Sequence, residues 1–189
     1  MITKESPLGG IKHGTVATVA IREIPGLPAF DLRVAPGTLS HAAIAEALAP
    51  LNLPAKSGQV GGYSVREESD AHALCLAPDW WLIVGFQEVE RKLAPLLSQN
   101  QHHFSVVDVS GQRTTLSLEG PVVREVLAHL WDQDLREKSF PIASVSQGLM
   151  AKAPVIVCHL APFRYRVMVR SSFALHLWKA LVDAAEEWV

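Results

Sequence analysis

Between positions 30 and 109, hydrophobic residues recur at every second position in some stretches and with helical spacing in others. The first pattern predicts strands and the second predicts helices. Phe30, Leu32 and Val34 alternate with charged residues, which is typical of a half-buried strand. Two stretches with helical spacing and two short apolar hairpin strands come next, before a final strand. The predicted elements are strands at 30–34, 71–76, 80–84 and 104–109 and helices at 38–49, capped by Thr38 or Ser40, and 89–97. Their order, β-α-β-β-α-β, is that of a ferredoxin-like unit.

The second half of the chain repeats this order of elements without repeating residues. The predicted elements are strands at 114–118, 149–153, 155–160 and 163–169, a helix after Gly120-Pro121, and a last helix capped by Ser171 or Ser172. A further strand, predicted at 15–23, belongs to neither series of elements and can complete the second sheet. We therefore predict an α+β fold of two ferredoxin-like (βαββαβ) halves, residues 15–110 and 111–189, after an N-terminal arm at residues 1–14.

Composition and charge narrow the class of protein. The chain is 49% hydrophobic and 19% charged, with a net charge of −2, so it has no basic field to attract nucleic acid or anionic lipid. No apolar run approaches the roughly 18 residues that a membrane span needs. Cys75 and Cys158 stand far apart in apolar runs and are predicted to be reduced packing residues, as in a cytoplasmic protein. The apolar balance indicates a surface that binds another protein.

Few residues are candidates for catalysis or for binding a phosphate or a metal ion. The glycine cluster at 58–62 lacks the Lys-Ser/Thr of a phosphate-binding loop, and residues 52–70 are predicted to be the least regular stretch. The histidines show no metal-ligand spacing, so we predict no metal site. Asp108, at a strand end, is the best-placed carboxylate. It is expected to accept turn N–H bonds, with a ligand contact as the alternative. We predict no catalytic residue.

Two surface features suggest contacts with a partner. On the strand 163–170, one face carries Phe163, Tyr165, Val167 and Val169, and the other carries Arg164, Arg166, Met168 and Arg170. The arginine row is a candidate interface for a partner's carboxylates, the alternative being a solvated sheet face. Trp80 and Trp81 must point to opposite faces of their strand. Both belong to the core only if both faces are covered; otherwise one is a candidate interface anchor.

Three segments together resemble the gamma subunit family of bacterial heterotetrameric sarcosine oxidase. They are residues 76–84 (LAPDWWLIV), residues 107–113 (VDVSGQR) with Leu118-Glu-Gly-Pro121, and residues 163–173 (FRYRVMVRSSF) with Trp178 and Trp188. The second segment is shared with the wider aminomethyltransferase superfamily, which has the fold of the glycine-cleavage T-protein. The resemblance extends from about Thr15 to the C-terminus.

The resemblance implies a fold similar to the folate-binding domain of aminomethyltransferases. It also implies a role in sarcosine catabolism and one-carbon metabolism, inside an αβγδ flavoenzyme that demethylates sarcosine to glycine. The partners would be the alpha, beta and delta subunits. FAD and covalent FMN would belong to the beta subunit and its contacts, NAD and tetrahydrofolate to the alpha subunit, and zinc to the delta subunit. None of these cofactors is expected to bind this chain.

One departure from the T-protein pattern bears on mechanism. T-proteins carry a Gly-Gly-x-x-Asp hairpin just after the strand that corresponds to 149–153, and its aspartate is the key acid at the folate. Residues 151–158 (AKAPVIVC) contain no carboxylate here, and apolar side chains cannot transfer a proton. We therefore expect a non-catalytic, structural subunit. The alternatives are a stand-alone folate-binding or one-carbon transfer protein, and a ferredoxin-like regulatory module for small metabolites.

Overall fold

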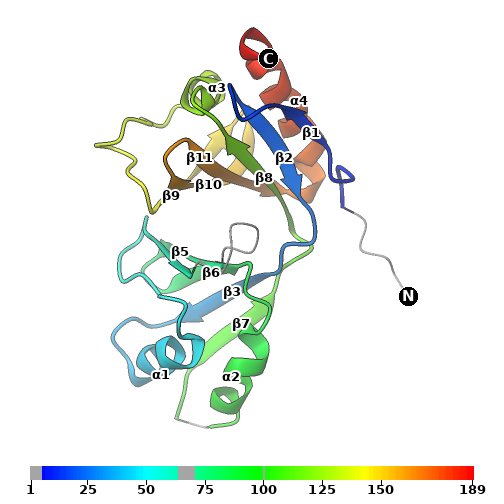
Figure 1. Cartoon of the computed structure of the whole chain (residues 1–189). Helices are drawn as coiled ribbons and strands as arrows, with labels where there is room; N and C mark the ends of the chain where they lie inside the picture. Colours follow the sequence, from blue (N-terminus) through cyan, green and yellow to red (C-terminus); the bar gives the residue numbers. More distant parts are fainter. Residues whose placement is uncertain (1–5, 64–70, 100) are drawn as a thin grey trace. The chain divides into compact units, whose positions relative to one another are not determined.

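The structure is a computed structural model that describes residues 6–63, 71–99 and 101–189. The chain divides into two compact units (Figure 1). The inserted unit consists of Leu27–Ser110, and the split unit combines Met1–Gly26 with Gly111–Val189. Each unit contains one sheet and two α-helices. The predicted α+β fold is confirmed, and no described helix has the length and apolar composition needed to cross a bilayer.

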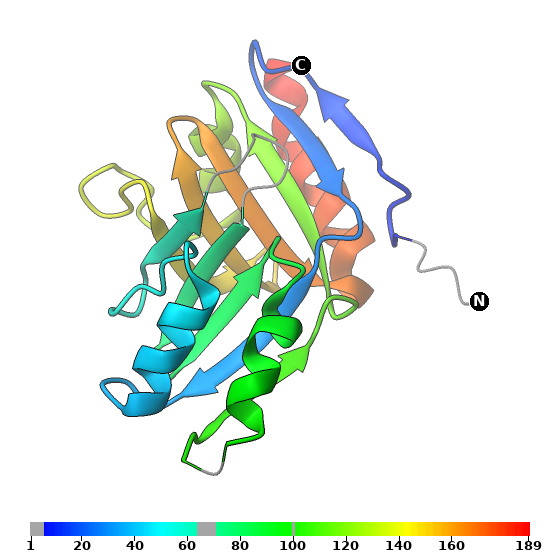
Figure 2. The same ribbon diagram turned by 60° about the horizontal axis from the view of Figure 1, so that its bottom comes forward.

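The inserted unit is a five-stranded antiparallel sheet with the strand order β4-β5-β6-β3-β7. Its elements are β3 (Ala29–Val34), α1 (Leu39–Leu48), β4 (Val60–Tyr63), β5 (Ala71–Ala77), β6 (Trp80–Val84), α2 (Val89–Leu97) and β7 (Phe104–Asp108). Helices α1 and α2 lie side by side on one face of this sheet (Figure 2). Thr38 caps α1 as predicted, because its Oγ1 accepts a hydrogen bond from the backbone N–H of His41 at 3.3 Å.

The core of the inserted unit lies between its sheet and its two helices. Alternate residues of β3, β5 and β6 contribute to it, which is the period-two pattern expected of half-buried strands. The fully buried helical residues that face them are Ile44, Leu48, Val89 and Leu93. Trp81 is fully buried in the same cluster, and its indole N–H donates to the carbonyl of Pro54 at 2.9 Å.

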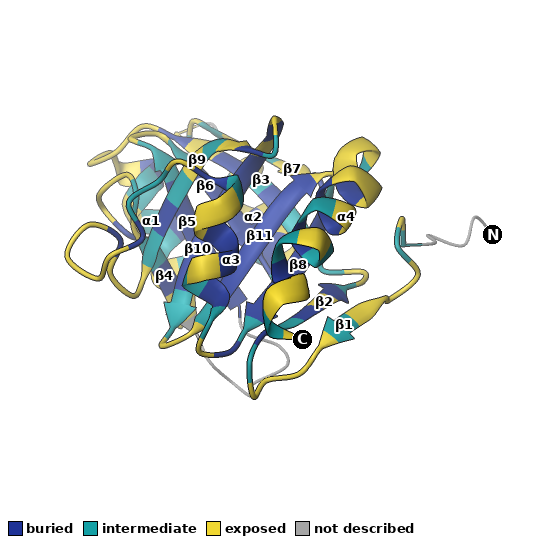
Figure 3. Cartoon of the chain, turned by 90° about the horizontal axis from the view of Figure 1, so that it is seen from above, coloured by how far each residue is buried: buried dark blue, intermediate teal, exposed yellow. Residues whose placement is uncertain are grey.

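The split unit is a six-stranded antiparallel sheet with the order β1-β2-β8-β11-β10-β9. Its elements are β1 (Lys12–Gly14), β2 (Ala20–Ile24), β8 (Arg113–Glu119), α3 (Val123–Leu130), β9 (Ser144–Met150), β10 (Ala153–Ala161), β11 (Arg164–Arg170) and α4 (Ala174–Ala185). Buried and exposed residues alternate along helices α3 and α4 (Figure 3), and the buried ones belong to the same core cluster as the apolar residues of the sheet.

The structure places residues 15–26 in the split unit and not, as the predicted range 15–110 has it, with the first half. The reason is that β2 pairs along β8, with Ile21 opposite Leu118, and that Ile21 fills the core of the split unit. The leftover strand thus completes the second sheet. Part of the predicted arm also belongs to this sheet, because β1 pairs with β2. Residues 1–5 of the arm lie outside the described residues.

A buried carboxylate fastens the described part of the arm. Glu23 accepts hydrogen bonds from the hydroxyl of Ser6 and, at 2.7 Å, from the backbone N–H of Gly10. Its own N–H donates to the carbonyl of Ile11 at 3.0 Å. The arm is therefore held against β2 by side-chain and backbone bonds.

Three local predictions differ from the structure. Residues 60–63 of the irregular stretch form β4, while residues 64–70 lie outside the described residues. The strand predicted at 149–153 ends at Met150, because Ala151 and Lys152 have φ values of 47° and 68° and form the turn into β10. Neither serine caps α4: Ser171–Phe173 form a 3-10 turn, and the Ser171 hydroxyl donates to the carbonyl of Gly111.

Both cysteines are free and buried, as predicted. Cys75 belongs to the core of the inserted unit, and Cys158 lies on β10 in the split unit. Burial raises the pKa of both thiols, that of Cys158 to about 12. Each therefore stays a neutral thiol at physiological pH.

Candidate functional site

The β9–β10 hairpin is the place where the T-protein resemblance locates a catalytic acid. Its turn is fixed by two hydrogen bonds at Ala151: the N–H donates to the carbonyl of Leu130 at 3.0 Å, and the carbonyl lies 2.8 Å from Nε2 of His176. The side chains around the turn are those of Lys152, which is exposed, Ala153, which is buried, and Pro154. The hairpin offers an ammonium group and apolar surface, but no carboxylate that could take up a proton.

Asp108 closes the end of β7. Its Oδ1 accepts the backbone N–H of Ser110 at 2.8 Å and the Ser110 hydroxyl at 2.5 Å. The same hydroxyl oxygen accepts the N–H of Ala29 at 3.0 Å, which ties the end of β7 to the start of β3. The predicted turn hydrogen bond is therefore present. A ligand contact of Asp108 stays a prediction.

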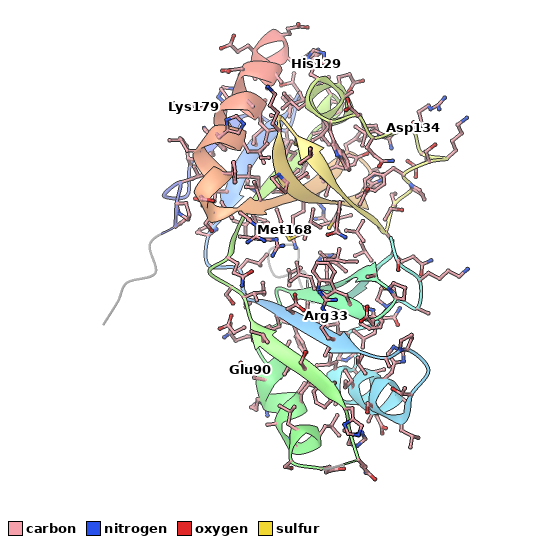
Figure 4. All side chains as sticks on the ribbon, turned by 180° about the vertical axis from the view of Figure 1, so that it is seen from behind. Arg33, Glu90, His129, Asp134, Met168 and Lys179 are labelled. Atoms are coloured by element: carbon pink, nitrogen blue, oxygen red, sulfur yellow. The ribbon has the colours of Figure 1, made fainter. Side chains whose placement is uncertain are left out.

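The two adjacent tryptophans have different roles. Trp81 belongs to the core, so its candidacy as an interface anchor is wrong. Trp80 is half-buried on the sheet face away from α1 and α2. Its indole N–H donates to Asp31 at 3.0 Å, and the guanidinium of Arg33, itself paired with Asp31, lies 4.1 Å from the ring centroid. Figure 4 shows Arg33 on β3. These three side chains form a preorganised cluster of the kind found at interface hot spots.

The arginine row of β11 is only partly accessible. Arg166 and Met168 are 8% and 1% exposed, so they do not form the docking row that the sequence pattern predicts. Both lie in the middle of β11, which is paired on one side with β8 and on the other with β10 (Figure 4 labels Met168). Arg164 is half-buried and Arg170 is exposed, at the two ends of the strand. These two stay candidates for partner contacts.

The structure also brings together an aromatic stack that sequence reasoning missed. The rings of His159 and Tyr165 are parallel within 5° and 4.4 Å apart, and Phe140 stacks on both. His159 Nδ1 is 2.9 Å from the carbonyl of Phe140. Arg124 on α3 donates to the Tyr165 hydroxyl at 2.8 Å and to Glu137 at 2.6 Å. The stack and the ion pair hold the segment between α3 and β9 against the sheet. The period-two pattern places Tyr165 on the same strand face as Val167 and Val169, but no sequence signal pairs it with Arg124.

The stack predicts a pH dependence of stability. Burial raises the pKa of Tyr165 above its ordinary value of about 10, while the hydrogen bond from Arg124 opposes this. The folded state therefore holds the hydroxyl proton more tightly, so this stabilisation is complete below pH 10 and is lost as the pH rises through the folded-state pKa. We expect Tyr165→Phe to cost about 1 kcal/mol at pH 7, because Arg124 loses an acceptor.

Urea unfolding of both proteins between pH 7 and pH 11 measures this effect. The difference in unfolding free energy between wild type and Tyr165→Phe should shrink above pH 10, since only the wild type loses the contribution of the neutral hydroxyl. A difference that stays constant over this range would contradict the assignment.

Among the described residues, no group of three His, Cys, Asp or Glu side chains is arranged to hold a metal ion. Of the features described above, the Trp80 cluster, the two end arginines of β11 and the β9–β10 hairpin remain accessible. They comprise aromatic, cationic and apolar groups, which are suited to contacts with a protein surface.

The family model and the individual relatives that match this chain point to the same family. The model of the "Sarcosine oxidase, gamma subunit family" matches residues 38–187. Sarcosine oxidase subunit gamma of Corynebacterium sp. (strain U-96) is 32% identical over 171 residues, which cover 90% of this chain and 80% of that protein. Sarcosine oxidase subunit gamma of an Arthrobacter species is 29% identical over 174 residues, with 92% and 83% covered.

Solved structures also resemble this chain, and two of them are informative. A chain of the heterotetrameric sarcosine oxidase from Corynebacterium sp. U-96, in complex with pyrrole 2-carboxylate, superposes with a TM-score of 0.82 at 30% identity, covering 93% of this chain and 88% of that one. Glycine cleavage system aminomethyltransferase T from Bartonella henselae superposes with a TM-score of 0.60 at 14% identity, covering 93% and 56%. The second similarity concerns the fold alone, and it confirms the predicted aminomethyltransferase-like fold.

Proposed function

Because this chain belongs to the sarcosine oxidase gamma subunit family, we propose that it acts as the gamma subunit of a heterotetrameric sarcosine oxidase and that its role there is structural. The complex is a flavoenzyme that demethylates sarcosine to glycine by oxidation. In this role the chain contributes folded surface to the assembly, and the other subunits contribute the chemistry.

The β9–β10 hairpin is the observation that carries the structural role. The fold is similar to that of an aminomethyltransferase, and the hairpin carries Lys152 and Pro154 where the T-protein resemblance implies a catalytic aspartate. Asp108, the other candidate carboxylate, accepts two hydrogen bonds from Ser110 through Oδ1 and so closes a turn. A T-protein-like fold without a positioned acid is suited to binding a partner and not to proton transfer.

The partners in this proposal are the alpha, beta and delta subunits in the cytoplasm. We assign FAD, FMN, NAD and tetrahydrofolate to those subunits and none of them to this chain. Trp80, Arg164 and Arg170 are the accessible side chains that we propose to contact a partner. Trp80 and its Asp31–Arg33 pair offer a fixed aromatic ring, and the arginines offer guanidinium groups to facing carboxylates.

Co-expression of the four subunits, with and without this chain, tests the proposal. We expect the four-subunit complex to purify as one species that oxidises sarcosine, and omission of this chain to reduce the yield of assembled enzyme at least tenfold. Permanent subunit interfaces bury on the order of 2,000 Å² or more, so losing one destabilises the whole assembly.

The isolated chain provides the control. It should not oxidise sarcosine, and calorimetry should detect no binding of tetrahydrofolate. A fully active, assembled enzyme without this chain would contradict the proposal, as would micromolar binding of tetrahydrofolate to the chain alone.

A further inference from the structure

Three loops emerge at the same end of the six-stranded sheet. Ala20 of β2, Glu119 of β8 and Arg164 of β11 lie opposite one another in register. The loop that precedes Ala20, the loop that follows Glu119 and the loop that precedes Arg164 must therefore leave the sheet together. We call residues 15–18, 120–122 and 161–163 the apolar rim.

Backbone hydrogen bonds join these three loops into one unit. The N–H of Gly120 donates to the carbonyl of Phe163 at 3.0 Å, and the N–H of Val122 donates to the carbonyl of Thr18 at 3.2 Å. Gly120 has a φ of 135°, and a Cβ at this position would lie 2.2 Å from the Thr18 carbonyl oxygen, so only glycine allows the contact. The rim is thus a fixed surface, with its loops held together by the main chain.

The rim has an unusual chemistry for an exposed set of loops. None of its residues carries a charge. Val16 is 63% exposed and Phe163 is 49% exposed, and Pro121 and Pro162 are exposed beside them. Surface loops of a protein that stays free in water ordinarily carry charged and polar groups. An uncharged patch that includes an aromatic ring is typical of the centre of a protein interface.

Phe163 holds its position at an energetic cost. Its φ is 58°, in the left-handed region that a bulky residue rarely occupies. Glycine or asparagine adopts this conformation more readily. The large aromatic residue is therefore not explained by the folding of the turn, and strain of this kind is characteristic of residues that serve a binding function.

We propose that the apolar rim docks onto another subunit of the complex, with the Phe163 ring entering an apolar, uncharged pocket of that subunit. This inference rests on the proposed function. An uncharged rim has no attraction for anionic lipid. Two prolines and a backbone-bonded turn lose little conformational freedom on docking, which favours a permanent contact.

Competition during assembly tests the docking role. Wild-type chain and Phe163→Asn, carrying different tags, are co-expressed in equal amounts with the other subunits, and mass spectrometry measures their ratio in the purified complex. We expect the variant to be depleted about tenfold or more, because it lacks the anchor ring. The isolated variant should melt at the wild-type temperature or up to about 4 °C higher, because asparagine tolerates the left-handed turn.

Two further variants provide a second test of the rim and a control outside it. Val16→Asp places a carboxylate on the rim at an exposed loop position and should be depleted to a similar extent. Phe173→Asn changes another exposed phenylalanine of the split unit, outside the rim and at a negative φ, and should be incorporated like wild type.

Each outcome has a distinct meaning. If wild-type chain is absent from the complex, the proposed function itself fails. If wild type is incorporated and the rim variants are incorporated equally well, only the docking role is overturned. Destabilisation of isolated Phe163→Asn would show that the ring serves the fold. Self-association of the isolated chain that Phe163→Asn abolishes would make a second copy the occupant, which also overturns the proposal.

Discussion

Replacing Trp81 by alanine is expected to lower the free energy of unfolding by about 3–5 kcal/mol. The side chain is fully buried in the core between β6 and the helices of the inserted unit. Its ring packs against that of His41, with 5.3 Å between the ring centroids, and its N–H satisfies the Pro54 carbonyl. Alanine would leave a large cavity and an unpaired buried carbonyl, and both effects destabilise the fold.

Urea unfolding followed by circular dichroism measures this loss, and the neighbouring tryptophan is a matched control. Trp80→Ala removes the same side chain one residue earlier, from a half-buried position. It breaks the hydrogen bond to Asp31 and the contact with Arg33, so a loss of about 1–2 kcal/mol is expected. Equal losses for the two variants would show that Trp81 is not the core residue the structure describes.

The second large effect is expected at Gly61. A Cβ on this residue would lie 1.9 Å from the backbone carbonyl oxygen of Asn52 and 2.9 Å from Cδ of Pro54. Both neighbours belong to the chain segment that passes over β4, and a backbone carbonyl cannot move aside as a flexible side chain can. Gly61→Ala should therefore cost about 3 kcal/mol, at the upper end of the usual range for overpacking.

The adjacent glycine is the control for this variant. A Cβ at Gly62 would make an ordinary contact, 3.5 Å from Cδ2 of His72. Gly62→Ala should therefore be neutral or stabilise the protein by up to about 1 kcal/mol, because alanine restricts the unfolded chain. Comparable unfolding midpoints for the two variants would contradict the close approach of Asn52.

These two glycines also explain why the sequence does not reveal β4. Glycine is rare inside strands, so a cluster at residues 58–62 predicts a loop. In the structure Gly61 is required by the nearby backbone of Asn52, which is a contact between segments and leaves no local pattern. Where the signal is local, the prediction succeeds: the alternation in β3 and the Thr38 cap of α1 are both found as expected.

The candidate site shows the same difference between local patterns, which the sequence reveals, and contacts between segments, which it does not. Period two separates the faces of Trp80 and Trp81, but it does not say which face the helices cover. It likewise groups Arg166 and Met168 as one row without revealing that both are buried in the middle of the sheet. The absence of a carboxylate from the β9–β10 hairpin, in contrast, is a property of the sequence itself, and the structure adds only the geometry of the turn.

The way the split unit is built from both ends of the chain has a consequence for biosynthesis. Strand β2 emerges from the ribosome early, but β8, its partner, is translated only after the whole inserted unit. The inserted unit has all of its strands by Ser110 and can fold during translation, whereas the edge of β2 that pairs with β8 must wait for its partner. The nascent chain therefore exposes Ile21 until the rest of the split unit's core is made, and this interval is when a chaperone would have most to protect.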